Sequence, residues 1–172
     1  MQSKWPWFER KFNFDFPAEK MPEIVERLVG TTLRIEAAVG DLDETVLTKR
    51  ETVGSWSIKE NAGHLACLEP LWMSRVDDML DGRETMREAD LTNQPTIAAN
   101  FNSQKIDAIV SEFQRQRTAM IQKLRELSVA QWSATSLHPR LMSQMRIVDL
   151  CQFIADHDDY HMARIRYLSV TA

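Results

Sequence analysis

Four long segments of this chain repeat apolar residues at intervals of three and four, the spacing that places them on one buried face of an α-helix. The segments cover residues 17–40, 57–82, 96–127 and 147–168. No segment alternates apolar and polar residues between hairpin turns, so β-strands are not expected. The pattern therefore predicts an all-α fold, a bundle of four helices.

The second and third helices are expected to be separated by a long connection. Residues 83–96, RETMREADLTNQPT, show no sustained period and contain Pro95. We expect a partly ordered connection that lies over one end of the bundle. Ser57 and Glu60 form a capping box that starts the second helix. Pro70 removes one backbone hydrogen bond inside that helix, so we expect a bend there.

The size and charge of the chain exclude several classes of protein. It has 172 residues, of which 44% are hydrophobic, so residues 1–172 are expected to form a single domain. The net charge of −4, with no basic cluster denser than RIR at 164–166, argues against nucleic acid as a partner. No stretch of about 18 apolar residues suggests a membrane span, and the N-terminal segment MQSKWPWFERKF lacks the pattern of a signal peptide. We therefore expect a cytoplasmic protein, in which Cys67 and Cys151 are buried thiols.

The last helical segment contains HDDYH, with two histidines in its apolar stripe. Imidazoles at i and i+4, here His157 and His161, can bind one metal ion at about 2.0–2.1 Å, and the alternative is a pair of core histidines. The resemblance to the zinc-protease motif HExxH fails, because Asp158 replaces the glutamate base. The 11 residues after His161 also contain no His, Asp, Glu or Cys. The pair therefore predicts a different kind of metal site.

Two other histidines could supply a third ligand. His64 shares one side of the second helix with Cys67 and Leu68, a side that is expected to face the bundle axis. His138 precedes Pro139 in a segment without helical period, a weaker platform for a ligand, and we expect it to pack in a loop or to face solvent. Cys67 lies one turn beyond His64 and is expected to be a wall residue of the site.

Three acids, Asp156, Asp158 and Asp159, lie beside the histidine pair. Residues directly before or after a ligand on a helix point about 100° away from it, so we expect these acids on the solvated side of the last helix. The groups that hydrogen-bond the histidines are then expected to come from other helices.

Several motifs together resemble the DinB-like superfamily, and in particular its YfiT-type branch. The characteristic elements are W-S-x-x-E-x-x-x-H-L in GSWSIKENAGHL, residues 54–65, and the C-terminal H-x-x-x-H in FIADHDDYHMARI, residues 153–165. The likeness extends over nearly the whole chain through LEPLWMSR, WPWFERKFNFDFP, ERLVGTTLRIE and HPRLMSQMRIVDL.

This resemblance implies a cytoplasmic four-helix bundle in which three histidines bind one divalent metal, zinc or nickel. The matching positions in this sequence are His64, His157 and His161. The family also includes thiol S-transferases that use low-molecular-weight thiols such as bacillithiol and mycothiol. Related bundles form homodimers, and the aromatic N-terminal WPWF is a candidate for cover by a second subunit.

Three neutral imidazoles would leave a divalent ion with its full charge and an open position, which is the pattern of a catalytic site. We therefore expect an enzyme that activates a low-molecular-weight thiol for transfer to a small-molecule electrophile. The alternatives are a metal-dependent hydrolase and a non-catalytic metal-binding or ligand-binding stress protein. Trp56, Trp72 and Tyr160 are candidates for the pocket wall, although each is also an ordinary core or rim aromatic.

Overall fold

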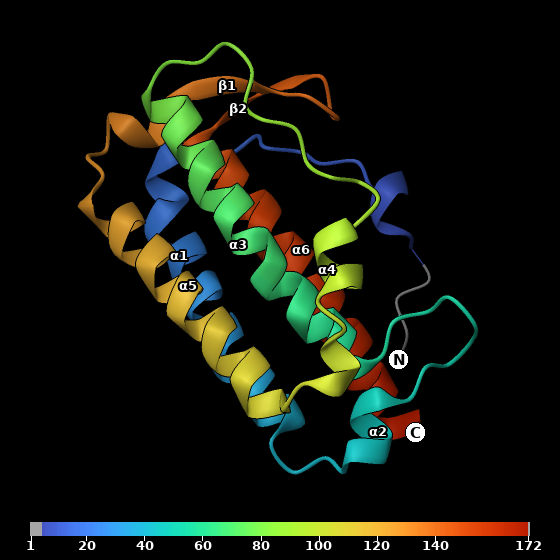
Figure 1. The fold of residues 1–172 in the computed structure, drawn as a ribbon. Helices are drawn as coiled ribbons and strands as arrows, with labels where there is room; N and C mark the ends of the chain where they lie inside the picture. Colours follow the sequence, from blue (N-terminus) through green and yellow to red (C-terminus); the bar gives the residue numbers. More distant parts are fainter. Residues whose placement is uncertain (1–4, 172) are drawn as a thin grey trace.

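The computed structural model describes residues 5–171, so the first four residues of the N-terminal segment MQSKWPWFERKF lie outside the described part. Four long helices run alongside one another (Figure 1). They are α1 (Met21–Val39), α3 (Ile58–Leu80), α5 (Ile106–Glu126) and α6 (Ile147–Thr171). Helices α1 and α3 each pack against both α5 and α6. The prediction of an all-α four-helix bundle is therefore confirmed.

Helix α3 begins where the sequence predicted. The Ser57 hydroxyl accepts a hydrogen bond from the backbone N–H of Glu60, and the Glu60 carboxylate accepts one from the backbone N–H of Ser57. The helix then continues through Pro70 to Leu80, and Gly82 follows it with a φ of 70°. The bend at Pro70 stays a prediction.

A small β-hairpin corrects the expectation that the chain has no strands. Strands β1 (Thr135–His138) and β2 (Ser143–Arg146) pair antiparallel at the end of the bundle opposite the short helix α2 (Glu44–Thr48), as Figure 1 shows. Each strand has only four residues, too few for alternation to be visible in the sequence. The connection after α3 joins this hairpin, since Leu137 exchanges backbone hydrogen bonds with Glu84 and Met86.

The third long helix starts later than predicted. Residues 96–105 were expected to belong to it, but they contain the end of α4 (Gln94–Ala98) and a 3-10 turn at Phe101–Ser103. Asn93 and Asn100 precede these two elements with φ of 57° and 46°. Asparagine adopts this left-handed conformation more readily than most residues, and the conformation interrupts a right-handed helix.

Further single turns of 3-10 helix lie in the segments between the long helices and before α1. They are Trp7–Glu9, Ala18–Lys20 and Gln131–Ser133. Among the described residues, no helix has both the length and the apolar character needed to cross a membrane.

A layer of buried polar side chains divides the core into two apolar clusters. One cluster includes Leu28 and Ile154, and the other includes Ile35 and Ile165. This layer contains the buried ion pairs of Arg117 on α5 with Glu69 on α3 and with Asp158 on α6. The histidine pair of α6 flanks this layer, so the site lies near the middle of the bundle.

Candidate metal centre

The structure brings three of the four histidines together. His64 lies on α3, and His157 and His161 lie on α6. All three side chains are buried, and one ring nitrogen of each lies within 4.8 Å of those of the other two. The ring centroids are separated by 4.6–5.4 Å. Such a cluster of nitrogen donors could hold a metal ion.

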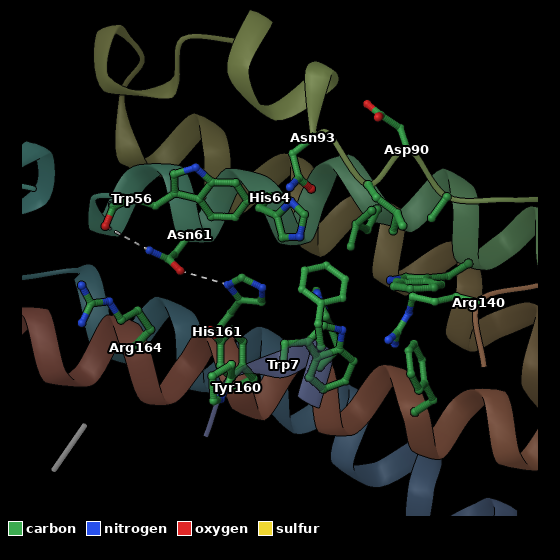
Figure 2. Close-up of a pocket in the computed structure, with 18 of the residues that line it drawn as sticks. Trp7, Trp56, Asn61, His64, Asp90, Asn93, Arg140, Tyr160, His161 and Arg164 are labelled. Atoms are coloured by element: carbon green, nitrogen blue, oxygen red, sulfur yellow. Dashed lines mark hydrogen bonds between the residues drawn. The ribbon is translucent and has the colours of Figure 1, made fainter. Parts of the chain in front are cut away.

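Two of the three rings are oriented by hydrogen bonds from other elements. Nδ1 of His161 donates to the Asn61 side-chain oxygen at 2.9 Å (Figure 2). The Asn61 amide nitrogen donates to the backbone oxygen of Ser57 at 2.7 Å, which fixes the amide so that its oxygen faces His161. His161 therefore carries its proton on Nδ1, and the lone pair on Nε2 is available to a metal.

The His64 ring is also oriented by a hydrogen bond, which comes from the connection between α3 and α5. Its Nδ1 lies 3.0 Å from the hydroxyl oxygen of Thr96 on α4. The expectation that polar partners come from other helices is met for both rings, because Asn61 is on α3 and Thr96 is on α4.

His157 has a buried nitrogen without a protein partner. Its Nδ1 makes no hydrogen bond to any described residue, and its ring contacts the edges of Trp7 and Trp72 at centroid distances of 4.9 and 5.9 Å. Buried polar atoms in proteins rarely lack a partner. A metal ion bound by the three imidazoles would fit this arrangement.

Burial keeps all three imidazoles neutral. Desolvation lowers the pKa of His64 to about 4. Desolvation, together with the neighbouring histidines, lowers the pKa of His157 and His161 well below the ordinary value. Neutral imidazole is the form that binds metal, so the three side chains need lose no proton at neutral pH.

Cys67 and His138 do not join the cluster of possible metal donors among the described residues. Cys67 is half-buried, and burial raises the pKa of its thiol. His138 is 2% exposed, so it packs inside the protein and does not face solvent. It is the last residue of β1, which corrects the expectation that it lies in a loop. Sequence reasoning missed the strand because the hairpin was not predicted.

The acids beside the histidine pair divide into two groups. Asp156 and Asp159 are partly exposed and pair with Arg27, as expected for the solvated side of α6. The expectation was wrong for Asp158, which is fully buried and pairs with Arg117 at 2.6 Å. Residue 158 points to α5, because α6 is covered by neighbouring helices on more than one side.

The three histidines open onto a cavity of about 610 Å³. Trp56, Trp72 and Tyr160 line it, as the sequence suggested. Trp7 adds a further aromatic wall (Figure 2). Trp7 is only 8% exposed and packs within this chain, so it needs no cover from a second subunit. Only the aromatic density of WPWF marked this residue in the sequence, because it lies outside the helical pattern.

The family of the chain follows from comparison with known proteins. A family model of the DinB superfamily matches residues 27–165. Among solved structures, YfiT from Bacillus subtilis is similar with a TM-score of 0.79 and 17% sequence identity, over 94% of this chain and 92% of that chain. YfiT is described as a probable metal-dependent hydrolase with an unusual four-helix bundle topology. No curated protein matches the sequence significantly. The chain belongs to the DinB superfamily.

Proposed function

We propose that this protein is a metal-dependent enzyme in which His64, His157 and His161 hold one divalent ion, zinc or nickel. The observation that carries the proposal is the convergence of three buried, neutral imidazoles, with ring nitrogens within 4.8 Å of one another, on one wall of a cavity. Structural zinc sites usually fill all four positions with protein atoms and often use cysteine, whereas catalytic sites keep one position open. No fourth donor joins the three histidines among the described residues.

The metal, when bound, would supply positive charge that favours the deprotonated form of a thiol or of water. The protein's own residues supply the rest. Asn61 and Thr96 fix the directions of His161 and His64. Trp7 and Trp72 pack against the ring of His157 and hold it in place. The same aromatic walls suit the apolar body of a small organic substrate.

For the reaction, we propose the activation of a low-molecular-weight thiol for transfer to an electrophile. A free thiol has a pKa of about 8.5 and water one of about 15.7, so a thiol requires far less help to lose its proton. The difference in pKa between the two groups therefore favours the thiol.

A metal-dependent hydrolase is the second candidate. It is supported by the description of YfiT, to which this chain is similar in fold. A non-catalytic binding protein is the third, and it would be favoured if spectroscopy of the metal-loaded protein revealed a fourth protein ligand such as Cys67 or His138.

The thiol proposal is tested by loading the protein with Co²⁺ and titrating bacillithiol, mycothiol, glutathione and cysteine. At least one thiol should produce a sulfur-to-cobalt charge-transfer band, and the band should be absent from His161→Ala. That thiol should also consume monochlorobimane faster with the metal-loaded protein than with the metal-free protein. If no thiol in the panel gives a band or turnover, the thiol proposal is wrong and the hydrolase remains.

A further inference from the structure

The cavity continues from the three histidines to a pair of arginines, Arg75 and Arg140. In Figure 2 the pocket runs from Arg164 and Trp56 at one end, past His64 and His161, to Arg140 at the other. Arg75 also lines it. Neither Arg75 nor Arg140 forms an ion pair with a carboxylate among the described residues, whereas Arg164 at the opposite end pairs with Glu51 at 2.7 Å.

One nitrogen of the Arg140 guanidinium group has no hydrogen-bond acceptor among the described residues. This nitrogen, Nη2, is buried. The guanidinium carbon lies 5.2 Å from the ring centroid of Phe8 and 6.0 Å from that of Phe153, so aromatic faces hold the side chain in place. Aromatic rings attract a cation but do not satisfy its N–H groups.

Arg75 lies deeper and is 2% exposed. Its Nε donates to the backbone oxygen of Arg87, and its Nη1 lies 3.1 Å from Nε2 of His138. The backbone oxygen carries no net charge. His138 is also neutral, because burial and the charges of Arg75 and Arg140 lower its pKa to about 4. The positive charge of Arg75 is therefore not balanced by its own hydrogen bonds.

The other arginines whose pKa shift is resolved differ from this pair in its direction. Wherever else a shift is resolved among the described arginines, neighbouring carboxylates raise the pKa, as Glu69 and Asp158 do for Arg117. Burial lowers the pKa of Arg75 to about 10, with Arg140 adding to the effect, and burial also lowers the pKa of Arg140. Two cations that repel each other in an apolar wall of the pocket are stabilised when an anion binds between or beside them.

The acids near this end of the pocket either accept hydrogen bonds from other residues or are exposed to solvent. Asp78 accepts three hydrogen bonds from Arg87, two of them from the guanidinium group, and also pairs with Arg83. Asp90 accepts from Thr92 and Gln94 in its own loop, and Figure 2 shows its carboxylate pointing away from Arg140. Glu88 lies on the exposed rim.

We propose that Arg140, with Arg75 behind it, binds an oxyanion of the small-molecule substrate, a carboxylate or a phosphate. A guanidinium group matches both anions because it can donate two parallel N–H bonds to them. Phe153 and Trp72 lie between the arginines and His157, with Phe153 near Arg140 and Trp72 near His157. The substrate class is therefore an anionic molecule with an apolar middle, whose reactive end reaches the histidines. This role deepens the proposed function and rests on it for the chemistry, but the anion site itself needs no metal.

The test uses metal-free protein, so that no anion can bind to a metal ion. Binding of benzoate, phenyl phosphate and the neutral analogue benzyl alcohol is measured by ligand-detected NMR titration. Wild-type protein should prefer at least one anion over benzyl alcohol by about tenfold or more, the effect of a hydrogen bond to a charged group. The preference should decline as ionic strength rises.

Substitutions assign the preference to Arg140. Arg140→Gln should remove it while benzyl alcohol binds within about twofold of wild type, which shows that the pocket is intact. Arg115→Gln, a control that removes the same charge from an exposed position on α5, should keep the preference. If Arg140→Gln also loses benzyl alcohol, Arg140→Lys decides, because it keeps the charge without the paired donors. A selective loss of anion binding in Arg140→Lys supports the site, and an equal loss of both ligands contradicts it.

The anion site is overturned if wild type shows no preference, if Arg140→Gln retains it, or if benzoate binds only after metal is restored. A failure of the anion site can be distinguished from a failure of the proposed function. A protein that binds no metal but prefers the anion would keep the anion site and lose the enzyme. A protein that binds metal but shows no anion preference would lose the anion site alone.

Discussion

Thr96 supplies the hydroxyl that orients His64, and it does so from α4, outside the four long helices. Its oxygen lies 3.0 Å from Nδ1 of His64 and it is 4% exposed. Groups that orient metal-binding histidines commonly change metal affinity by about 10–100-fold when they are removed. The geometry of the site therefore depends on a residue that neither binds metal nor belongs to the same helix.

Thr96→Val should weaken metal binding by about tenfold, because valine has the same shape but cannot accept or donate a hydrogen bond. Thr96→Ser keeps the hydroxyl and should stay close to wild type. Competition with a coloured chelator measures both affinities. Equal affinities for wild type and Thr96→Val would show that the Thr96 hydroxyl does not orient the ligand.

The candidate ligands could be predicted from the sequence because helical periodicity places them. His64, His157 and His161 fall on the apolar faces of two strongly periodic segments, so their burial follows from the pattern. Trp7 and His138 could not be placed in this way. They lie in segments without a period, and only contacts between distant parts of the chain bring them to the pocket.

At the scale of the helices, Arg117 connects all four members of the bundle. From α5 it donates to Glu69 of α3 and to Asp158 of α6, both at 2.6 Å. Its Nη1 also donates to the backbone oxygen of Leu28 on α1 at 3.4 Å. Because Arg117 is completely buried, its substitution would leave two carboxylates without a counter-charge.

Arg117→Met should lower the free energy of unfolding by about 3–5 kcal/mol, the usual effect of breaking a buried ion pair on one side. Burial already raises the pKa of Glu69, and loss of Arg117 removes the charge that opposes this effect. Urea unfolding at neutral pH measures the change. The control is Arg115→Met, which removes an exposed pair with Glu112 and should leave the unfolding midpoint nearly unchanged. A midpoint for Arg117→Met as high as that of the control would contradict a stabilising role for this cluster.

The long helices were predictable from periodicity and from the capping box at Ser57, whereas the short elements were not. The hairpin at residues 135–146 has strands of four residues, and its position depends on pairing with Glu84 and Met86 from a distant connection. The late start of α5 depends on the left-handed backbone at Asn100, a local choice that competes with the apolar pattern. The position of the hairpin therefore depends on long-range pairing, and the start of α5 depends on local backbone conformation, neither of which the apolar pattern specifies.

For the whole molecule, the buried histidines predict a metal-free protein that loses stability in mild acid. The pKa of His64 and of His138 is about 4, below the value of about 6.5 for an unfolded chain. Between these two values the unfolded chain binds more protons than the folded chain, so protonation favours unfolding. Stability is therefore complete above about pH 6.5 and falls as the pH drops toward 4.

Each buried histidine should contribute up to about 2 kcal/mol of this loss at pH 5. Urea unfolding of chelator-treated protein at pH 7.5 and pH 5.0 measures it. His138→Gln should lose less stability between the two pH values, because one titrating group is absent. An unfolding midpoint that is equal or higher at pH 5.0 in wild type would contradict the neutral, buried state of these side chains.

The homodimer expected from the family resemblance stays a prediction. Trp7 is covered within the chain, but Trp5 and Phe8 of the same aromatic segment are 55% and 60% exposed. We expect a second copy to cover them. Sedimentation at micromolar concentration should then give a species of about twice the 19.9 kDa chain mass. A monomer alone under these conditions would contradict the dimer.

The most direct test of the account is the metal content of purified protein after dialysis against excess zinc or nickel. We predict about one ion per chain for wild type and for His138→Ala, since His138 lies outside the donor cluster. His64→Ala and His157→Ala should each retain almost no metal, because two imidazoles hold a divalent ion poorly. Far-UV circular dichroism would establish that the variants are folded. Equal metal content in wild type and in folded His64→Ala would contradict the three-histidine site.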